Sequence, residues 1–312
     1  MLKNNSDIYF HANGKLLLTS EYLVLDGAIA FALPTKLGQS LSFENTSNSN
    51  AIEWKSVDCE GNIWHYEIID RKFIDQDPAE INDEVSRYIL KIFQFIENQI
   101  PNFIENNLGK SLQFHLDFPR NWGLGTSSTL ISLISQWANI NPYELLNYTF
   151  GGSGYDIACA TAHAAIEFQL IDSKPIVKDL LFEPNFKKNL FFIYLEQKQN
   201  SRNAIHHYRK KQKPSNGELL IMNQLSEELF YAKDILAFES AIVEHELFIS
   251  KFIGLNPIKD QLFRDYWGAI KSLGAWGGDF VLATSTKDHQ TTLSYFKDNG
   301  YNTVFLFSDL VK

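Results

Sequence analysis

The pattern of hydrophobic and polar positions predicts a chain that mixes strands and helices. Residues 8–43 are largely apolar and carry the turn signals Asn13-Gly14 and Asp26-Gly27, so we expect several short strands packed as a meander. Between 83 and 100, apolar residues recur near helical spacing and predict an amphipathic helix. The other elements expected in the first half of the chain are strands at 51–56, 62–69 and 111–118, helices at 126–138 and 142–149, and a helix that begins near residue 155.

The last third of the chain predicts a second set of mixed elements. After the apolar segment 189–195, three helical stretches are expected between 215 and 271, separated at Ala237 and at Asn256-Pro257. A strand at 279–283, a helix at 287–297 and a strand at 302–307 follow.

The length of the chain favours two domains. With 312 residues and 45% hydrophobic content, the chain is at the size where one core usually splits into two. We therefore expect an α+β fold of two domains, 1–180 and 181–312, with the boundary in the segment 173–188.

Composition excludes several classes of partner and site. The chain has 37 acidic and 28 basic residues, a formal charge of −9 and no basic stripe, so nucleic acid is not an expected partner. Its two cysteines, Cys59 and Cys159, form no CxxC pattern, so neither a disulfide framework nor a structural zinc site is expected. No apolar run approaches the roughly 20 residues that span a bilayer. We expect a soluble protein of the reducing cytoplasm, without a membrane partner.

Three glycine-rich segments, at 14–27, 119–129 and 272–280, are candidates for a ligand site. Glycines let the backbone approach a ligand, and amide groups at the start of a helix attract anions. The second segment leads directly into a predicted helix, so it could bind phosphate, and its hydroxyls could reach a magnesium ion. An ordinary turn with Ser or Thr N-caps would give the same pattern. A Walker A loop is excluded, because Ile104 stands where the first glycine before Gly109-Lys110-Ser111 should be.

Two charged residues beside these segments are candidates for catalysis. Asp156 lies at the start of a predicted helix, after the glycine-rich run 151–154, and could act as a general base. An acid there can equally be a first-turn residue favoured by the helix dipole. Lys15 follows a glycine and precedes an apolar run, so it either points into a ligand site or is a solvated surface charge.

Four ordered segments resemble the motifs of one superfamily of kinases. They are a glycine-lysine strand followed by Glu21-Tyr22, the Pro-x(3)-Gly-Leu-Gly-Thr-Ser loop from Pro119, the Ser-Gly-x-Asp helix at 153–156 and the Gly-Ala-x-Gly-Gly loop at 274–278. In this order they resemble the GHMP kinases, named for galactokinase, homoserine kinase, mevalonate kinase and phosphomevalonate kinase. The resemblance covers about residues 8–285.

Two further details narrow the resemblance. Glu21-Tyr22 and Gly277-Gly278-Asp279 resemble phosphomevalonate kinases more than mevalonate kinases. The sequence GSGYDIA at 152–158 is similar to a set of bacterial GHMP kinases known by the tag GYDIA.

The resemblance implies a fold, two cofactors and a set of site residues. The fold would comprise a domain like the second domain of ribosomal protein S5 and a ferredoxin-like domain, and the cofactors would be ATP and Mg²⁺. Asp156 would be the catalytic base, and Lys15 would orient it and neutralise charge. The nucleotide phosphates would contact Gly123, Leu124, Gly125, Thr126, Ser127 and Ser128, and magnesium would be held by Ser127 and Glu144. The acceptor would contact Glu21, Tyr22, Ser153, Gly154, Ser201, Gly274, Ala275, Gly277 and Gly278.

The chain departs from the family pattern at several positions. Asn13 replaces a proline, Ser20 replaces a glycine, and Trp276 stands where most relatives have glycine. We expect the indole of Trp276 either to cap the acceptor pocket or to narrow it.

The implied activity is ATP-dependent phosphorylation of a hydroxyl or phosphate of mevalonate, phosphomevalonate or a related small acid, within isoprenoid biosynthesis by the mevalonate pathway. The substrate would be a small anion, with Lys15, Arg120 and Arg202 as the nearest cations. Two alternatives stay open: a decarboxylase acting on diphosphomevalonate, and a catalytically silent ligand sensor with the GHMP fold. A homodimer is also left open.

Overall fold

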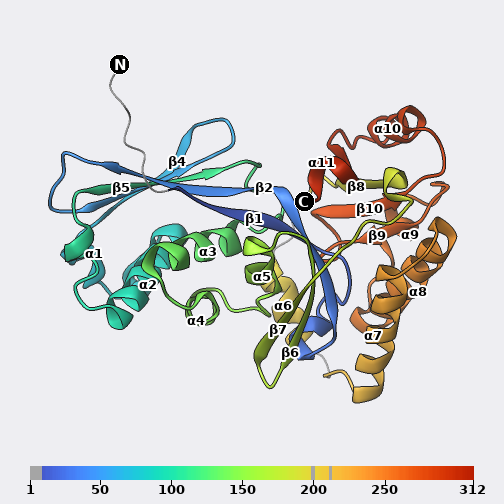
Figure 1. Ribbon diagram of the computed structural model, residues 1–312, viewed down its shortest axis with the longest axis horizontal. Coiled ribbons are helices and arrows are strands. Elements are labelled where there is room, and N and C mark those ends of the chain that lie inside the picture. Colours follow the sequence, from blue (N-terminus) through green and yellow to red (C-terminus); the bar gives the residue numbers. More distant parts are fainter. Residues whose placement is uncertain (1–8, 198–200, 211–212) are drawn as a thin grey trace. The chain divides into compact units, whose positions relative to one another are not determined.

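The computed structural model describes residues 9–197, 201–210 and 213–312 (Figure 1). Contacts divide the chain into two compact units. The described residues of the first unit are 9–14, 37–120 and 125–161, and those of the second are 15–36, 121–124, 162–197, 201–210 and 213–312. Strands β1 (Tyr9–Leu17) and β2 (Ala30–Asn45) contribute residues to both units. The sequence-based boundary near residue 180 stays a prediction.

The first unit contains a mixed sheet with helices. β5 (Lys110–Leu116) pairs antiparallel with the second half of β2 and parallel with β3 (Ile52–Val57), which pairs antiparallel with β4 (Ile63–Ile69). The helices of this unit are α1 (Arg71–Ile74), α2 (Glu84–Gln99), α3 (Thr126–Ala138), α4 (Pro142–Thr149) and α5 (Tyr155–Thr161).

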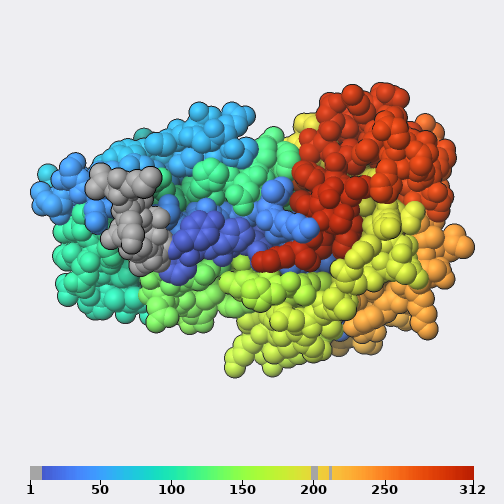
Figure 2. Space-filling view, turned by 45° about the horizontal axis from the view of Figure 1, so that its top comes forward, coloured from blue at the N-terminus to red at the C-terminus, as the bar shows by residue number. Residues whose placement is uncertain are grey.

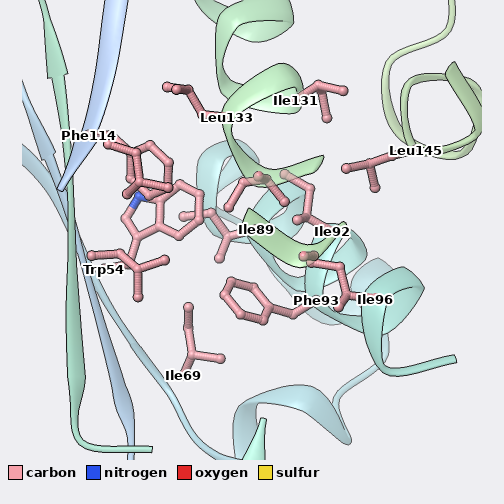
Figure 3. Close-up of a cluster of buried hydrophobic side chains, with 14 of the residues drawn as sticks. Trp54, Ile69, Ile89, Ile92, Phe93, Ile96, Phe114, Ile131, Leu133 and Leu145 are labelled. Atoms are coloured by element: carbon pink, nitrogen blue, oxygen red, sulfur yellow. The ribbon is translucent and has the colours of Figure 1, made fainter. Parts of the chain in front are cut away.

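The core of the first unit forms where the apolar stripes of its helices meet one face of the sheet (Figure 3). Alternate residues of β3 are buried, and Trp54 among them stacks on Phe114 of β5 with 4.1 Å between ring centroids. Phe93 of α2 meets the same indole edge-on at 6.1 Å. Ile89 and Ile96 of α2 are buried as well, since residues three or four positions apart share one helix face. This core supports α3 and α5, which carry candidate site residues.

The second unit contains an antiparallel sheet of four strands, in the order β11-β8-β10-β9. Their bounds are β8 (Leu190–Tyr194), β9 (Ile270–Ser272), β10 (Phe280–Thr284) and β11 (Val304–Leu306). The helices are α6 (Ser201–Arg209), α7 (Asn216–Phe230), α8 (Ile235–Ile253), α9 (Ile258–Leu262), α10 (His289–Asp298) and α11 (Phe307–Leu310). Within the described ranges, no helix combines the length and apolar character needed to cross a membrane.

Several element predictions were wrong in detail. The predicted meander at 8–43 is instead formed, from residue 9 onward, by two long strands around the 3-10 turn η1 (Leu23–Asp26). The expected helix break at Ala237 lies earlier, because the Asp234 carboxylate accepts the Ala237 N–H at 2.9 Å and starts α8 there. The third helical stretch ends at Leu262, and β9 follows it.

A hairpin in the second unit was not predicted. β6 (Ala165–Ile171) and β7 (Lys174–Leu180) pair antiparallel, and β6 also pairs with the first residues of β2. Most of β7 is exposed, and the hairpin appears in yellow-green at the surface in Figure 2. An exposed strand lacks the burial that produces apolar alternation, so its sequence carries little signal.

Candidate functional site

The second glycine-rich segment forms a turn that leads directly into α3. Gly123 and Gly125 have φ angles of +69° and +100°, a left-handed conformation that glycine adopts at little steric cost. Gly125 is the N-cap of α3, and as a glycine it has no side chain with which to cap the helix. The Ser127 hydroxyl is exposed, whereas Ser128 is buried and donates to the Gly125 carbonyl at 2.9 Å. The start of α3 is therefore suited to bind an anion through its backbone N–H groups.

Lys15 holds this turn from within the second unit. Its backbone N–H donates to the Leu124 carbonyl at 2.9 Å, and its Nζ donates to the Gly123 carbonyl at 2.9 Å. A Cβ built on Gly274 would lie 4.0 Å from the same Nζ. The ammonium group thus lies near both the second and the third glycine-rich segments. Because Lys15 is only partly exposed and bonded in this way, it differs from a solvated surface lysine.

An aromatic cluster anchors the same turn to the sheet of the second unit. The Trp122 ring packs against Tyr194, Phe280 and Phe305, with centroid distances of 5.8, 5.8 and 5.5 Å. The Tyr194 hydroxyl donates to the Asn121 carbonyl at 3.1 Å. The sequence analysis missed this support, because its members are far apart in the chain and no local pattern joins them.

Asp279 was also missed as a neighbour of the turn. It is 6% exposed, and a Cβ built on Gly123 would lie only 2.3 Å from its carboxylate. The Asp279 N–H donates to the Gln197 carbonyl at 2.7 Å, and its own carbonyl accepts the Leu195 N–H at 2.8 Å. These bonds hold the backbone of Asp279, so a side chain at position 123 would have to displace the carboxylate and would also be strained at φ of +69°.

Asp156 is the second residue of α5, in the first unit. Its Oδ1 accepts the N–H of Ile157 at 3.0 Å, and its side chain is partly buried. Gly154, with φ of +89°, packs on Tyr143 so closely that a Cβ would come within 2.9 Å of the ring. Burial, with the negative charge of Asp156 nearby, raises the pKa of Tyr143 to about 12. The carboxylate therefore lies near a phenol that stays neutral.

Asn13, which stands where the motif that the sequence resembles has proline, supports the same helix. It is 4% exposed, and its Nδ2 donates to the Cys159 carbonyl of α5 at 3.3 Å. The substitution thus adds a buried bond between β1 and the helix that carries Asp156.

Glu21 lies in a buried charged cluster of the second unit. Its Oε1 accepts from Lys271 Nζ at 2.6 Å, and the same Nζ lies 3.3 Å from Oε1 of Glu246. Nε2 of His245 accepts the Ser20 N–H at 3.1 Å. Burial, partly opposed by Lys271, raises the pKa of Glu21 to about 7, and burial also raises the pKa of Glu246. Burial and the nearby lysine lower the pKa of His245 well below its usual value, so this ring is neutral.

The turn around Glu21 is strained. Ser20 and Tyr22 have φ angles of 61° and 67°, which residues with side chains seldom adopt. The ion pair of Glu21 holds this turn on one side. On the other, the Tyr22 hydroxyl accepts the Trp276 N–H at 3.1 Å. The structure thus describes Glu21 as fully buried, and its contact with the acceptor stays a prediction.

The raised pKa of Glu21 predicts a pH dependence of stability. Its pKa is about 7 in the folded chain against an ordinary 4.5, so the folded state binds more protons between these values. The free energy of unfolding should therefore fall as pH rises from about 4.5 to 7, with a slope of up to about 1.4 kcal/mol per pH unit. Urea unfolding of Glu21→Gln should show a flatter dependence between pH 5 and 7. An unchanged slope, equal to that of the exposed control Glu60→Gln, would assign the titration to another group.

Trp276 packs inward. Its side chain is 5% exposed and belongs to a core cluster with Leu23, Met222, Ile249 and Ile253. The expectation that the indole caps or narrows a pocket is therefore incomplete, since much of the ring fills the interior.

Removing the indole should destabilise the protein. Trp276→Gly leaves a cavity in this cluster and should lower the free energy of unfolding by about 3–5 kcal/mol, the usual range for large aromatic truncations. Trp276→Phe should retain most of that stability, because a ring still fills the site. Urea denaturation of both variants measures the effect. Wild-type stability of the glycine variant would show that the indole is not part of the core.

The remaining predicted site residues differ in how far they are described. Ser201 begins α6, and the side chains of Ser201 and Arg202 lie outside the described residues. The guanidinium carbon of Arg120 lies 3.4 Å from the centroid of the Trp64 ring. Ala275 and Gly278 are buried, and Ser153 is partly buried.

The metal assignment to Ser127 and Glu144 stays a prediction. Glu144 is exposed on α4, and its Oε1 accepts from Asn141 Nδ2 at 3.3 Å. In the part of the chain that is described, no group of three or more His, Cys, Asp or Glu residues could hold a metal ion. Ser127 and Glu144 are both exposed, and a metal held mainly by nucleotide phosphates would need few protein ligands.

Comparison with known proteins gives similarity in structure only. No family model matches the sequence, and no curated protein matches it at a significant level. The chain is similar to mevalonate kinase of Methanococcus jannaschii, with 17% identity, a TM-score of 0.72 and coverage of 97% of this chain and 98% of that chain. The phosphomevalonate kinase of Streptococcus pneumoniae, solved with phosphomevalonate and AMPPNP, gives 16% identity, a TM-score of 0.69 and coverages of 96% and 99%. Galactokinase of Lactococcus lactis, solved with galactose, gives 13% identity, a TM-score of 0.67 and coverage of 94% of this chain and 88% of that chain. At such identities these similarities establish a shared fold.

Proposed function

We propose that this chain, which has the GHMP kinase fold, is an ATP-dependent kinase of a small molecule. The shared fold confirms the sequence-based resemblance at the level of the fold. The observation that carries the proposal is the position of Lys15, which bonds to the Gly123 carbonyl and lies near Gly274. A cation fixed between two glycine-rich segments is suited to a ligand that carries phosphate.

The nucleotide would bind at the start of α3. Backbone N–H groups of Thr126, Ser127 and Ser128 would contact its phosphates, since the N-cap Gly125 has no side chain to bond them. Ser127 and Glu144 would hold magnesium, which neutralises phosphate charge when bound. The supports at Trp122 and Asp279 would keep the turn fixed, so little ordering is needed when the nucleotide binds.

Phosphoryl transfer forms a bond between the acceptor oxygen and the γ-phosphorus and breaks the bond between that phosphorus and ADP. Asp156 would take the proton of an acceptor hydroxyl, which typically contributes about 10²–10⁴-fold to the rate. Lys15 would balance the negative charge of the phosphoryl group as it moves. When the acceptor is already a phosphate, the electrostatic contribution of Lys15 would matter more than proton removal.

The acceptor we propose first is mevalonate, phosphomevalonate or a related small acid. Lys15 and Arg120 supply positive charge near the second glycine-rich segment in an otherwise acidic chain. The proposal includes a place in the cytoplasm, in isoprenoid synthesis by the mevalonate pathway. We expect the mevalonate and phosphomevalonate kinases of similar structure to share the motifs at Glu21-Tyr22 and 274–278, which would contact the acceptor.

A coupled assay of ADP release tests the proposal. Purified protein with ATP and Mg²⁺ should release ADP with mevalonate or phosphomevalonate and release little with homoserine or galactose. Turnover of galactose alone would overturn the acceptor and keep the kinase. Carbon dioxide release from diphosphomevalonate would favour the decarboxylase, and ATP binding without any turnover would favour the sensor.

A further inference from the structure

A pocket of about 540 Å³ opens within the second unit, beside the third glycine-rich segment. Its walls come from α6, from the region between the end of α8 and α9, and from Trp276-Gly277. The volume falls in the range of about 300–1,000 Å³ that is typical of small-molecule sites. A small acid alcohol would leave much of this space to water.

One wall of the pocket is aromatic. Tyr22 and Tyr208 stack with 5.5 Å between ring centroids and an interplanar angle of 23°. Their hydroxyls already have partners: that of Tyr208 donates to Asp26 at 2.6 Å, and that of Tyr22 accepts from Trp276 N–H. The rings therefore offer the pocket mainly apolar surface.

Other lining residues are aliphatic or carry amide groups. Leu255 and Leu262 line the pocket and are 51% and 45% exposed, so apolar surface faces solvent there. Asn203 and Gln261 supply amide groups to the lining. Among the side chains that are described, the lining includes no Asp, Glu, Lys or Arg.

From this lining, we propose that the pocket binds an uncharged amphipathic small molecule, with an apolar body and hydroxyl or carbonyl groups at one edge. The apolar body would cover the leucines and lie against the stacked tyrosines, and the polar edge would meet the amides. Burial of apolar surface would supply most of the affinity. A charged ligand would lose hydration here, and among the described lining side chains only His207 could carry a compensating charge.

This inference goes beyond the proposed kinase activity and does not depend on it. The pocket adjoins the acceptor residues expected from sequence, since Tyr22 and Gly277 line it. Its ligand is therefore either an effector that acts through the third glycine-rich segment or an uncharged acceptor, which would replace the small acid proposed above. An assay of ADP release with ATP and the pocket ligand as the sole candidate acceptor distinguishes the two roles. An acceptor is phosphorylated and consumed, whereas an effector is not.

A neutral fluorescent probe tests the pocket directly. The probe 6-propionyl-2-(dimethylamino)naphthalene should bind the wild-type chain with a blue shift in emission, and it should bind more tightly than the anionic 1-anilinonaphthalene-8-sulfonate. Ala204→Trp fills the pocket and Leu255→Asp places a charge at its wall, so each should weaken probe binding by about tenfold or more. Leu255 is half-exposed, so its variant should fold.

The matched control is Leu220→Asp, since Leu220 is 68% exposed on α7 and does not line the pocket. This variant should bind the probe like the wild type. Failure of the wild type to bind, tighter binding of the sulfonate, or equal loss in the control would each overturn the proposal. ATP titration of the same samples reports separately on the proposed kinase function.

Discussion

Asp156→Asn is expected to lower kcat by about 10²-fold or more while leaving ATP affinity near the wild-type value. Asparagine keeps the size of aspartate and an oxygen that can accept the N–H of Ile157, so α5 should stay intact. The amide has no basicity with which to take a proton from an acceptor hydroxyl. Steady-state kinetics, with ATP affinity from calorimetry, measures the two effects separately.

The alternative role of Asp156 predicts a different result. If the acid only favours the helix dipole, its removal should cost about 0.3–1 kcal/mol of stability and leave kcat unchanged. Glu84→Gln, which alters an exposed first-turn acid of α2, provides the control for that effect. A folded Asp156→Asn variant with the kcat of this control would refute the assignment as base.

Local sequence signals located the elements of the first unit well. The bounds of α3 and α4 agree with the predicted ranges 126–138 and 142–149. Both helices begin at clear signals: Gly125 ends a glycine-rich turn, and Asn141 caps the Tyr143 N–H at 2.9 Å ahead of Pro142 at the first position. Such signals act within a few residues, so the sequence is sufficient to recognise them.

The partners of the candidate residues could not be predicted in this way. Lys271 meets Glu21 across 250 positions of sequence, and Lys15 meets Gly123 across 108. A lysine in a short strand gives no sign that it will be buried beside two carboxylates, because that environment exists only once the chain has folded. The sequence motifs therefore identified Lys15 and Glu21 as candidate residues. They did not predict that Lys15 is partly exposed beside a glycine-rich turn, whereas Glu21 is fully buried beside Lys271.

The order of the glycine-rich segments was nevertheless informative about the fold. Each segment alone is consistent with an ordinary turn, yet the similarity to solved GHMP kinases extends over 94–97% of the chain. The structure adds what the order could not supply, namely the neighbours of the second segment. Asp279 and Trp122 lie in or beside motifs already recognised, but contact with the turn gives them a supporting role.

Gly123→Ala is expected to weaken ATP binding by about tenfold or more, because a methyl group at this position would displace the turn. A Cβ there would lie 2.3 Å from the Asp279 carboxylate, and the φ of +69° adds strain of about 1–3 kcal/mol for a residue with a side chain. Gly125→Val, at φ of +100°, should abolish binding at the start of α3.

The clash and the strain can be separated by a matched glycine and by a second substitution. Gly61→Ala carries similar strain at φ of +88°, but a Cβ there meets nothing within 4 Å, so this variant should bind ATP normally. Adding Asp279→Ala to Gly123→Ala removes the carboxylate and should restore part of the lost affinity, relative to Asp279→Ala alone. Calorimetric titration with ATP compares all four variants. Full ATP affinity in a folded Gly123→Ala protein would place the phosphate site away from this turn, because the combined clash and strain at φ of +69° should shift the backbone N–H groups that would bind phosphate.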